Sequence, residues 1–162
     1  MALLNHNTRY KEILNPRRYF FVTTNTSMGR QLLQSERNAN LLIDTLRSLV
    51  VEGKFVVHDF VIMPDHLHLL LEIDHKTTIE KAMQFIKGRY SHRIKSECGY
   101  LGEVWQRGFA EKQVKTEADM EACRRYIALN PIKAGLATEI DEYPFCFRYL
   151  ARIKQGLKPE GP

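Results

Sequence analysis

Two histidines separated by one residue, His66 and His68, lie inside an otherwise apolar run. On a β-strand, side chains two positions apart project from the same face. The two imidazoles therefore point to one place, whereas Leu67, Leu69 and Leu71 point to the opposite face. Two neutral imidazoles converging from a rigid strand form half of a metal site. A strand whose polar face is half solvated is the alternative reading, which the pair by itself leaves open.

A tyrosine and an asparagine four residues apart, Tyr126 and Asn130, form a second candidate pair. Thr116, followed by an acid three residues later, predicts the start of a helix there. The proline at position 131 predicts that this helix ends near Asn130. Residues four apart are neighbours on a helix, so the phenol and the amide lie together. A core tyrosine with a satisfied hydroxyl and a helix-capping asparagine are the alternatives.

The two pairs have a joint chemical reading. Two histidines and one amide oxygen can hold a divalent cation and leave its other positions for phosphate oxygens. A tyrosine beside that cation supplies the nucleophile for phosphoryl transfer through a covalent intermediate. Because the unperturbed pKa of a phenol is about 10, the tyrosine requires activation by the metal or by a base.

Four blocks in this order resemble the single-tyrosine HUH transposases, and within them the REP-associated tyrosine transposases. They are residues 63–70 (MPDHLHLL), 86–90 (IKGRY), 104–107 (VWQR) and 126–136 (YIALNPIKAGL). The early segment 19–25 (YFFVTTN) also fits the first strand of that family. One short motif is weak evidence, whereas several motifs in the family order are strong evidence. The segment 143–147 (YPFCF) departs from the Tyr-Pro-Trp-Ser-Ser-like pattern of the family.

The resemblance implies a transposase that cleaves and rejoins single-stranded DNA with imperfect palindromic hairpins. It implies that Tyr126 forms a 5′-phosphotyrosine intermediate and that Mg²⁺ or Mn²⁺ is held by His66, His68 and Asn130. It is compatible with a monomer or a homodimer. Two alternatives remain open: a non-catalytic nucleic-acid-binding module of the same fold, and a histidine-pair metal hydrolase in which water attacks.

Cationic, polar and aromatic residues in the same blocks are candidates for DNA binding. They are Lys87, Arg89, Trp105, Gln106, Arg107 and Lys133. Lysine and arginine supply the sequence-independent part of DNA affinity, and an aromatic ring can stack on a base. Charges on a solvated face and a core tryptophan are the alternatives.

Two further residues bear on the chemistry. Tyr90 is the rival nucleophile, but it lies on an apolar stripe with the helical spacing of a core. Glu72 shares the strand face of the two histidines. We expect its carboxylate to be able to orient a metal-binding histidine through a hydrogen bond to the ring.

The composition is that of an ordinary globular domain with a basic balance. The chain has 162 residues and a formal net charge of +5, which favours polyanionic partners without requiring them. Its three cysteines form no C-x-x-C pair, which argues against a zinc cluster or a disulfide scaffold. We expect a cytoplasmic protein, because no signal peptide and no long apolar run is present.

The pattern predicts one domain over residues 1–162, with a basic arm at 1–18 and a loose tail at 148–162. Strands are expected at 18–24, 54–63 and 66–73 and between 104 and 114. Helices are expected from the cap at Ser35 to about 51, from Thr77 or Thr78 to about 96, and from Thr116 to about 130. This order predicts an α+β fold, a ferredoxin-like split βαβ antiparallel sheet. The added C-terminal helix would carry the catalytic tyrosine.

Overall fold

A sheet of four antiparallel strands lies at the centre of the computed structural model, which describes residues 17–154. The strands are β1 (Arg18–Asn25), β2 (Val56–Met63), β3 (His66–Ile73) and β4 (Ala110–Val114), in the order β2-β3-β1-β4. The histidine-bearing strand β3 is therefore a central strand, paired with β1 on one side and β2 on the other. This arrangement confirms the predicted ferredoxin-like α+β fold.

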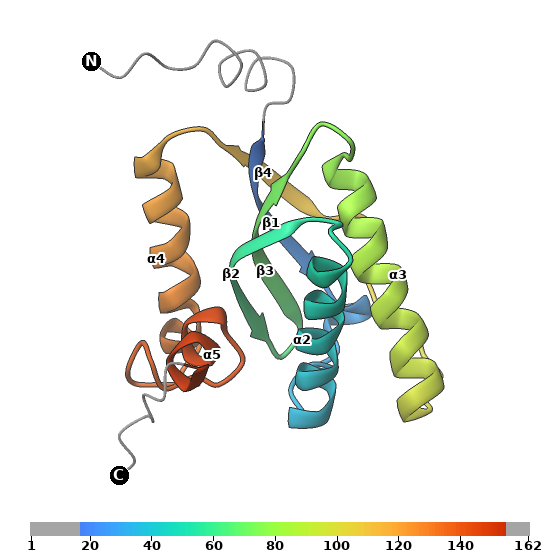
Figure 1. The fold of residues 1–162 in the computed structure, drawn as a ribbon. Helices are drawn as coiled ribbons and strands as arrows, with labels where there is room; N and C mark the ends of the chain where they lie inside the picture. The colour runs from blue at the N-terminus through green and yellow to red at the C-terminus, as the bar shows by residue number, and fades with distance from the viewer. Residues whose placement is uncertain (1–16, 155–162) are drawn as a thin grey trace, which may run out of the picture.

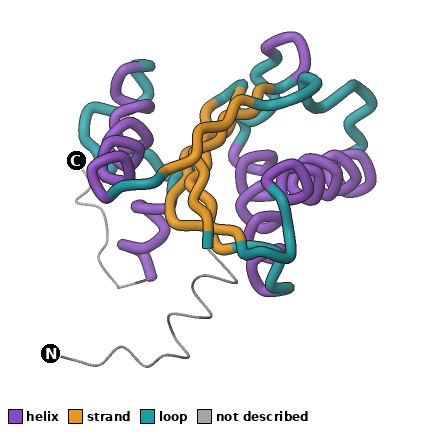
Figure 2. The backbone as a smooth tube through the Cα atoms, turned by 90° about the horizontal axis from the view of Figure 1, so that it is seen from above, coloured by secondary structure: helices purple, strands orange, loops and turns teal. Residues whose placement is uncertain are grey.

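Helices cover both faces of the sheet (Figure 1). Helices α2 (Glu36–Val51) and α3 (Ile79–Cys98) pack on one face, and α4 (Glu117–Lys133) and α5 (Phe147–Lys154) pack on the other (Figure 2). A short 3-10 helix, η1 (Ser27–Gly29), follows β1. No helix within residues 17–154 is long and apolar enough to cross a membrane.

Local sequence signals explain where the long helices begin. The hydroxyls of Ser35, Thr78 and Thr116 each accept a hydrogen bond from the backbone N–H three residues later, which satisfies a free donor of the first turn. All three predicted caps are confirmed. Pro64 and Asp65 form a tight turn between β2 and β3.

Alternation along β3 divides the protein into two cores. Leu67, Leu69, Leu71 and Ile73 are buried in the larger cluster beneath α2 and α3. Leu70 belongs to the smaller cluster beneath α4, and His68 lies on that same face. The two histidines thus face α4, as the period-two pattern predicted.

Two predicted boundaries were wrong. Helix α4 continues through Pro131 to Lys133 instead of ending at Asn130. The proline ring is buried, and a further turn closes behind it because Ala134 N donates to Asn130 O at 3.1 Å and Leu136 N donates to Pro131 O at 2.8 Å. Packing of the ring and these bonds outweigh the single helical bond that proline removes. The second strand begins at Val56 and not at residue 54.

The predicted loose tail is also partly wrong, because residues 147–154 form α5. Arg148 and Arg152 both bind the carboxylate of Asp141, at 2.6 and 3.2 Å, which ties the helix to the preceding loop. Of the predicted basic arm, Arg17 and Arg18 bond to residues of β3 and of the loop that follows it. Residues 1–16 of the arm and 155–162 of the tail lie outside the described residues.

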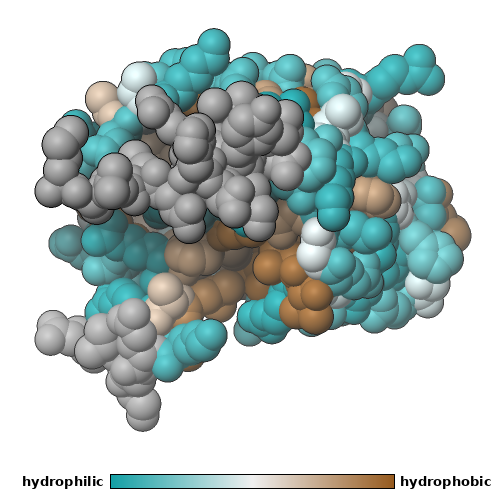
Figure 3. Space-filling model, turned by 45° about the horizontal axis from the view of Figure 1, so that its top comes forward, coloured by the Kyte–Doolittle hydropathy of each residue, from teal (hydrophilic) through white to brown (hydrophobic). Residues whose placement is uncertain are grey.

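On the face drawn in Figure 3, hydrophobic side chains gather in a hollow near the centre, with hydrophilic residues around it. Contiguous apolar surface marks binding sites more often than scattered single apolar side chains do.

Candidate active site

The two histidines converge on one point beneath α4. The ring centroids of His66 and His68 are 4.7 Å apart and the rings are nearly perpendicular. His68 is 4% exposed, whereas the side chain of His66 is 24% exposed at the end of the strand. The pair therefore spans the boundary between the core and solvent, where a bound phosphate oxygen can reach it.

Each histidine has a partner on the same ring nitrogen. Nδ1 of His68 is 2.7 Å from the hydroxyl oxygen of Thr23 on β1, and Nδ1 of His66 is 2.6 Å from a carboxylate oxygen of Asp65. When each Nδ1–H donates to its oxygen, each Nε2 presents its lone pair. Oxygen acceptors of this kind fix the tautomer of metal-binding histidines and raise their basicity.

The free nitrogen of His68 is unusual for a buried group. Its Nε2 is buried and has no hydrogen-bond partner among residues 17–154. Burial, followed by repulsion from His66, lowers the pKa of His68 to about 4, and an interaction with the Asn130 side chain opposes the shift. The imidazole is therefore neutral at pH 7, which is the form that coordinates a metal.

Tyr126 lies directly against this histidine. The two ring centroids are 5.2 Å apart, and the ring of Phe21 on β1 contacts both. Tyr126 is nevertheless 45% exposed, so that a DNA strand can approach it. The ammonium of Lys133 lies 5.8 Å from the tyrosine ring centroid, which places a cation beside the phenol.

Asn130 lies one helical turn beyond Tyr126. Its amide nitrogen donates to the carbonyl oxygen of Tyr126 at 3.3 Å, which leaves its side-chain oxygen as an acceptor. The structure therefore brings together His66, His68 and Tyr126, and it brings Asn130 within reach of His68.

The donor set fits a divalent cation only if the amide is counted. Within residues 17–154, no group of three or more His, Cys, Asp or Glu side chains could hold a metal. The available protein ligands are the two Nε2 atoms and the side-chain oxygen of Asn130. Such a set suits a divalent ion that completes its coordination with water and phosphate oxygens. The Nε2 of His68, without a hydrogen-bond partner in the described part of the chain, is consistent with this fit.

Tyr90, the rival nucleophile, is a core residue. It is fully buried, its hydroxyl donates to the carbonyl oxygen of Asn38 at 3.0 Å, and burial raises its pKa above the ordinary value. A phenol in this position cannot reach a DNA phosphate.

Glu72 does not orient either histidine of the pair, contrary to the prediction. Its carboxylate binds Nε2 of His58 at 2.7 Å and the guanidinium of Arg17 at 3.0 Å, further along the strand. The residue that fills the predicted role for His66 is Asp65. Thr23, which fills it for His68, was missed, because only the pairing of Thr23 with His68 across β1 and β3 reveals it.

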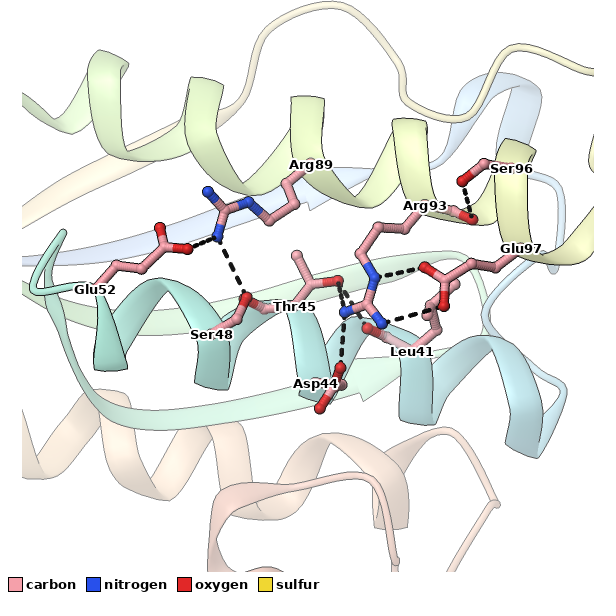
Figure 4. Close-up of polar contacts among 9 residues, drawn as sticks. All are labelled: Leu41, Asp44, Thr45, Ser48, Glu52, Arg89, Arg93, Ser96 and Glu97. Carbon is pink, nitrogen blue, oxygen red and sulfur yellow. Dashed lines mark hydrogen bonds and ion pairs between the residues drawn. The ribbon is translucent and has the colours of Figure 1, made fainter.

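Two of the predicted DNA contacts, Lys87 and Arg89, belong to α3, on the opposite side of the sheet from Tyr126. The Lys87 ammonium donates to the carbonyl oxygens of Gln106 and Gly108, and Arg89 binds Glu52 of α2 at 2.7 Å. Figure 4 shows this arginine pointing from α3 toward α2. Both side chains thus bond to other parts of the protein, and their role in DNA binding stays a prediction.

Trp105 is buried in the core, which favours the core alternative over the predicted role in base stacking. It is 7% exposed, packs against Tyr90 and donates its indole N–H to the carbonyl oxygen of Lys87 at 3.1 Å. A stacking platform has to present its ring face to the base, and this one is covered.

We therefore expect Trp105→Ala to reduce the free energy of unfolding by about 3–5 kcal/mol, the usual cost of emptying a large aromatic site in a core. Urea denaturation followed by circular dichroism measures it. Gln106→Ala, an exposed neighbour, serves as the control and should change stability little. A Trp105→Ala protein of unchanged stability that binds DNA weakly would return the tryptophan to the DNA interface.

The other predicted DNA contacts remain open to solvent. Gln106 and Arg107 are exposed, and the backbone N–H of Gln106 donates to the carbonyl oxygen of Asn25. Asn25 pairs with His66 across the sheet, so this loop borders the end of the site. Lys133 is exposed beside Tyr126.

Comparisons with known proteins point to one family. A family model described as "Transposase IS200 like" matches residues 18–130. A REP-associated tyrosine transposase of Escherichia coli is 24% identical over 146 residues, which cover 87% of this chain and 81% of that protein. A candidate REP-associated tyrosine transposase of Haemophilus influenzae is 24% identical over 109 residues, and the match spans only 61% of each protein.

A solved structure is similar along most of the chain. It is a REP-associated tyrosine transposase bound to a REP hairpin, with a TM-score of 0.66 and 25% identity, and the match covers 88% of this chain and 82% of that one. The resemblance predicted from the four blocks is thereby confirmed. Because the family model matches residues 18–130, which include His66, His68, Tyr126 and Asn130, the chain belongs to the IS200-like transposase family.

Proposed function

We propose that this protein cleaves and rejoins single-stranded, hairpin-containing DNA through a covalent bond to Tyr126, with a divalent cation as cofactor. The observation that carries the proposal is the buried Nε2 of His68, which has no hydrogen-bond partner among residues 17–154. His68 is 4% exposed, and its ring lies against the half-exposed Tyr126. A free lone pair beside an accessible phenol is the arrangement that metal-assisted attack by tyrosine requires.

The protein's own residues account for most of the chemistry. His66 and His68 would hold Mg²⁺ or Mn²⁺ through Nε2, with Asp65 and Thr23 fixing the rings from behind. Asn130 would add its side-chain oxygen. When bound, the cation polarises the scissile phosphodiester and neutralises charge on its oxygens.

The transfer itself exchanges one ester for another. The hydroxyl oxygen of Tyr126 forms a bond to phosphorus, and the bond between phosphorus and the 3′-oxygen breaks. The phenol gives up its proton, and the departing 3′-oxygen gains one. The product is a 5′-phosphotyrosine and a free 3′-hydroxyl, so a 3′-hydroxyl can attack the adduct and join strands. Lys133 and the loop carrying Gln106 and Arg107 are available for phosphates of the bound strand.

Hairpin DNA as the substrate is supported by one relative. The solved structure of a similar protein contains a REP hairpin. The net charge of +5 is consistent with a polyanionic partner. A non-catalytic DNA-binding module could use the same surface. Binding alone, however, does not require the half-exposed Tyr126 to lie against the imidazole of His68.

The decisive experiment uses a pool of single-stranded oligonucleotides that carry imperfect hairpins, randomised single-stranded flanks and a 3′ fluorescent label. After incubation with the full chain and Mn²⁺, a denaturing gel should show a labelled band that migrates as protein plus DNA. The same reaction with EDTA should show none. Cleaved DNA without an adduct would identify water as the nucleophile, and binding without cleavage would identify a binding module.

A further inference from the structure

A pocket lies on the other flank of the helix that carries the tyrosine. It has a volume of about 550 Å³ and is enclosed by α4, α5 and β2. Its walls are apolar and include Ile127 and Pro131 from α4, Ile140 from the following loop, and Phe147 from α5. A pocket of this size and character is typical of a small-molecule or single-nucleotide site.

One carboxylate, that of Asp59, lies among these apolar walls. Asp59 is 9% exposed, and burial raises its pKa to about 6, while Phe60 N–H, Arg124 and Arg148 act in the opposite direction. One carboxylate oxygen accepts from Phe60 N at 2.9 Å. The other is 3.9 Å from the guanidinium of Arg124, which is too long for a hydrogen bond. A buried acid with a weakly partnered oxygen is a costly feature for a core to keep.

A β-bulge directs this carboxylate toward the pocket. The pairing of β2 with β3 shifts between Val57 and Asp59, so His58 is an extra residue. In a regular strand residues 57 and 59 would share a face. Val57 instead packs on the core beneath α2 and α3, while Asp59 lines the pocket beneath α4. Bulges commonly turn a side chain in this way next to binding sites.

Arginines surround the mouth of the pocket. Arg124 and Arg125 come from α4 and Arg148 comes from α5, and the side chains of Arg124 and Arg148 are 44% and 57% exposed. The site therefore combines apolar walls, one buried carboxylate and three arginines. That combination suits an unpaired nucleotide whose base enters the pocket and whose phosphates stay outside.

The Asp59 carboxylate accepts hydrogen bonds and can therefore discriminate among the four nucleobases. On its Watson–Crick edge, guanine presents two adjacent donors, N1–H and the N2 amine, which match the two oxygens of a carboxylate. Cytosine and adenine place a ring acceptor beside their amine, and thymine flanks its one donor with two carbonyls. Each of these would turn a lone pair toward Asp59, at an electrostatic cost in a dry pocket.

We propose that the pocket between α4, α5 and β2 binds one unpaired guanine of the DNA substrate, with Asp59 accepting hydrogen bonds from the base. The inference rests on the proposed function for its ligand, since it takes DNA to be the partner. It assigns a recognition role to a site that is separate from the histidines. Because α4 carries Tyr126 on one flank and closes the pocket with Ile127 and Ala128 on the other, a base held here would set the register of the strand at the tyrosine.

The test measures equilibrium binding without metal, so it does not depend on cleavage. The full chain is mixed with the hairpin pool with randomised flanks, and the bound oligonucleotides are sequenced. Guanine should be enriched at one unpaired position. At that position, guanine is then replaced by inosine, which lacks the N2 amine. Affinity for the wild-type protein should fall about tenfold, within the range of a lost bidentate base contact.

Three variants locate the effect. Asp59→Asn keeps an acceptor for Phe60 N–H but places an amine or a single oxygen toward the base, so it should bind the guanine and inosine oligonucleotides equally. Ala128→Phe should block the pocket and remove the same preference. Glu111→Gln, an exposed acid-to-amide change on β4, should retain it.

Absence of a guanine preference, preference for another base, or a tenfold preference that survives in Asp59→Asn would each overturn the assignment. The covalent-adduct assay on the same protein separates the two proposals. An adduct without guanine preference refutes only the pocket, and guanine preference without an adduct refutes only the transferase.

Discussion

Tyr126→Phe is expected to abolish the covalent protein–DNA adduct and to leave the fold unchanged. The substitution removes one oxygen and keeps the ring that contacts His68 and Phe21. The hydroxyl lies on a half-exposed side chain, so little stability depends on it. The labelled band on the denaturing gel should disappear entirely, because phenylalanine has no atom that can bond to phosphorus.

The matched control is Tyr90→Phe, the same atomic change in a core position. It removes the hydrogen bond to the carbonyl oxygen of Asn38 and should cost about 1 kcal/mol of unfolding free energy. Adduct formation should persist. Proteolysis of the wild-type adduct and mass spectrometry should place the nucleotide on a peptide containing Tyr126. A modified Tyr90 peptide would refute the site assignment.

His68→Ala is expected to eliminate cleavage and to weaken Mn²⁺ binding. Loss of a residue that only supports a metal ligand typically weakens binding by about 10–100-fold, and loss of the ligand itself should weaken it by more. The reason is that His68 offers a buried Nε2 with no other partner among the described residues. Titration calorimetry with Mn²⁺ measures the binding, and the gel assay measures cleavage. Hairpin binding in EDTA should remain, since phosphate contacts elsewhere supply much of the affinity.

His92→Ala provides the histidine control, because this residue is exposed on α3 in the opposite layer. It should bind Mn²⁺ and cleave like the wild type. Undiminished cleavage by His68→Ala, or by the wild type in EDTA, would contradict the metal role. If His68→Ala binds Mn²⁺ normally yet does not cleave, the metal lies elsewhere and His68 acts only on the tyrosine.

Much of the site follows from periodicity, which the sequence displays directly. Placing His66 and His68 on one strand face needs only the two-residue repeat of a strand, and bringing Tyr126 near Asn130 needs only the helical turn. The caps at Ser35, Thr78 and Thr116 are local too, because each hydroxyl bonds to a backbone N–H three residues away. Such features depend on neighbours in the chain, so they could be predicted.

A sequence motif does not show which face of the sheet its residues cover. Lys87 and Arg89 on α3 and the buried Trp105 lie in blocks typical of the family, yet they belong to the layer opposite Tyr126. A sequence motif gives the identity of a residue but not its contacts. A buried tryptophan whose indole N–H is hydrogen-bonded cannot be distinguished in the sequence from an exposed one. Pro131 inside α4 is a similar case, because burial of its ring decides where the helix ends.

What the sequence by itself determined is the four strands, the three long helices, the shared face of the histidine pair and the neighbouring phenol and amide on α4. Only the tertiary structure decided that Thr23 holds the ring of His68, and that a bulge turns Asp59 away from the larger core into a pocket. These contacts depend on strand register and on packing between segments far apart in the chain. Side-chain partners across a sheet are chosen by the whole fold, and no local pattern encodes them.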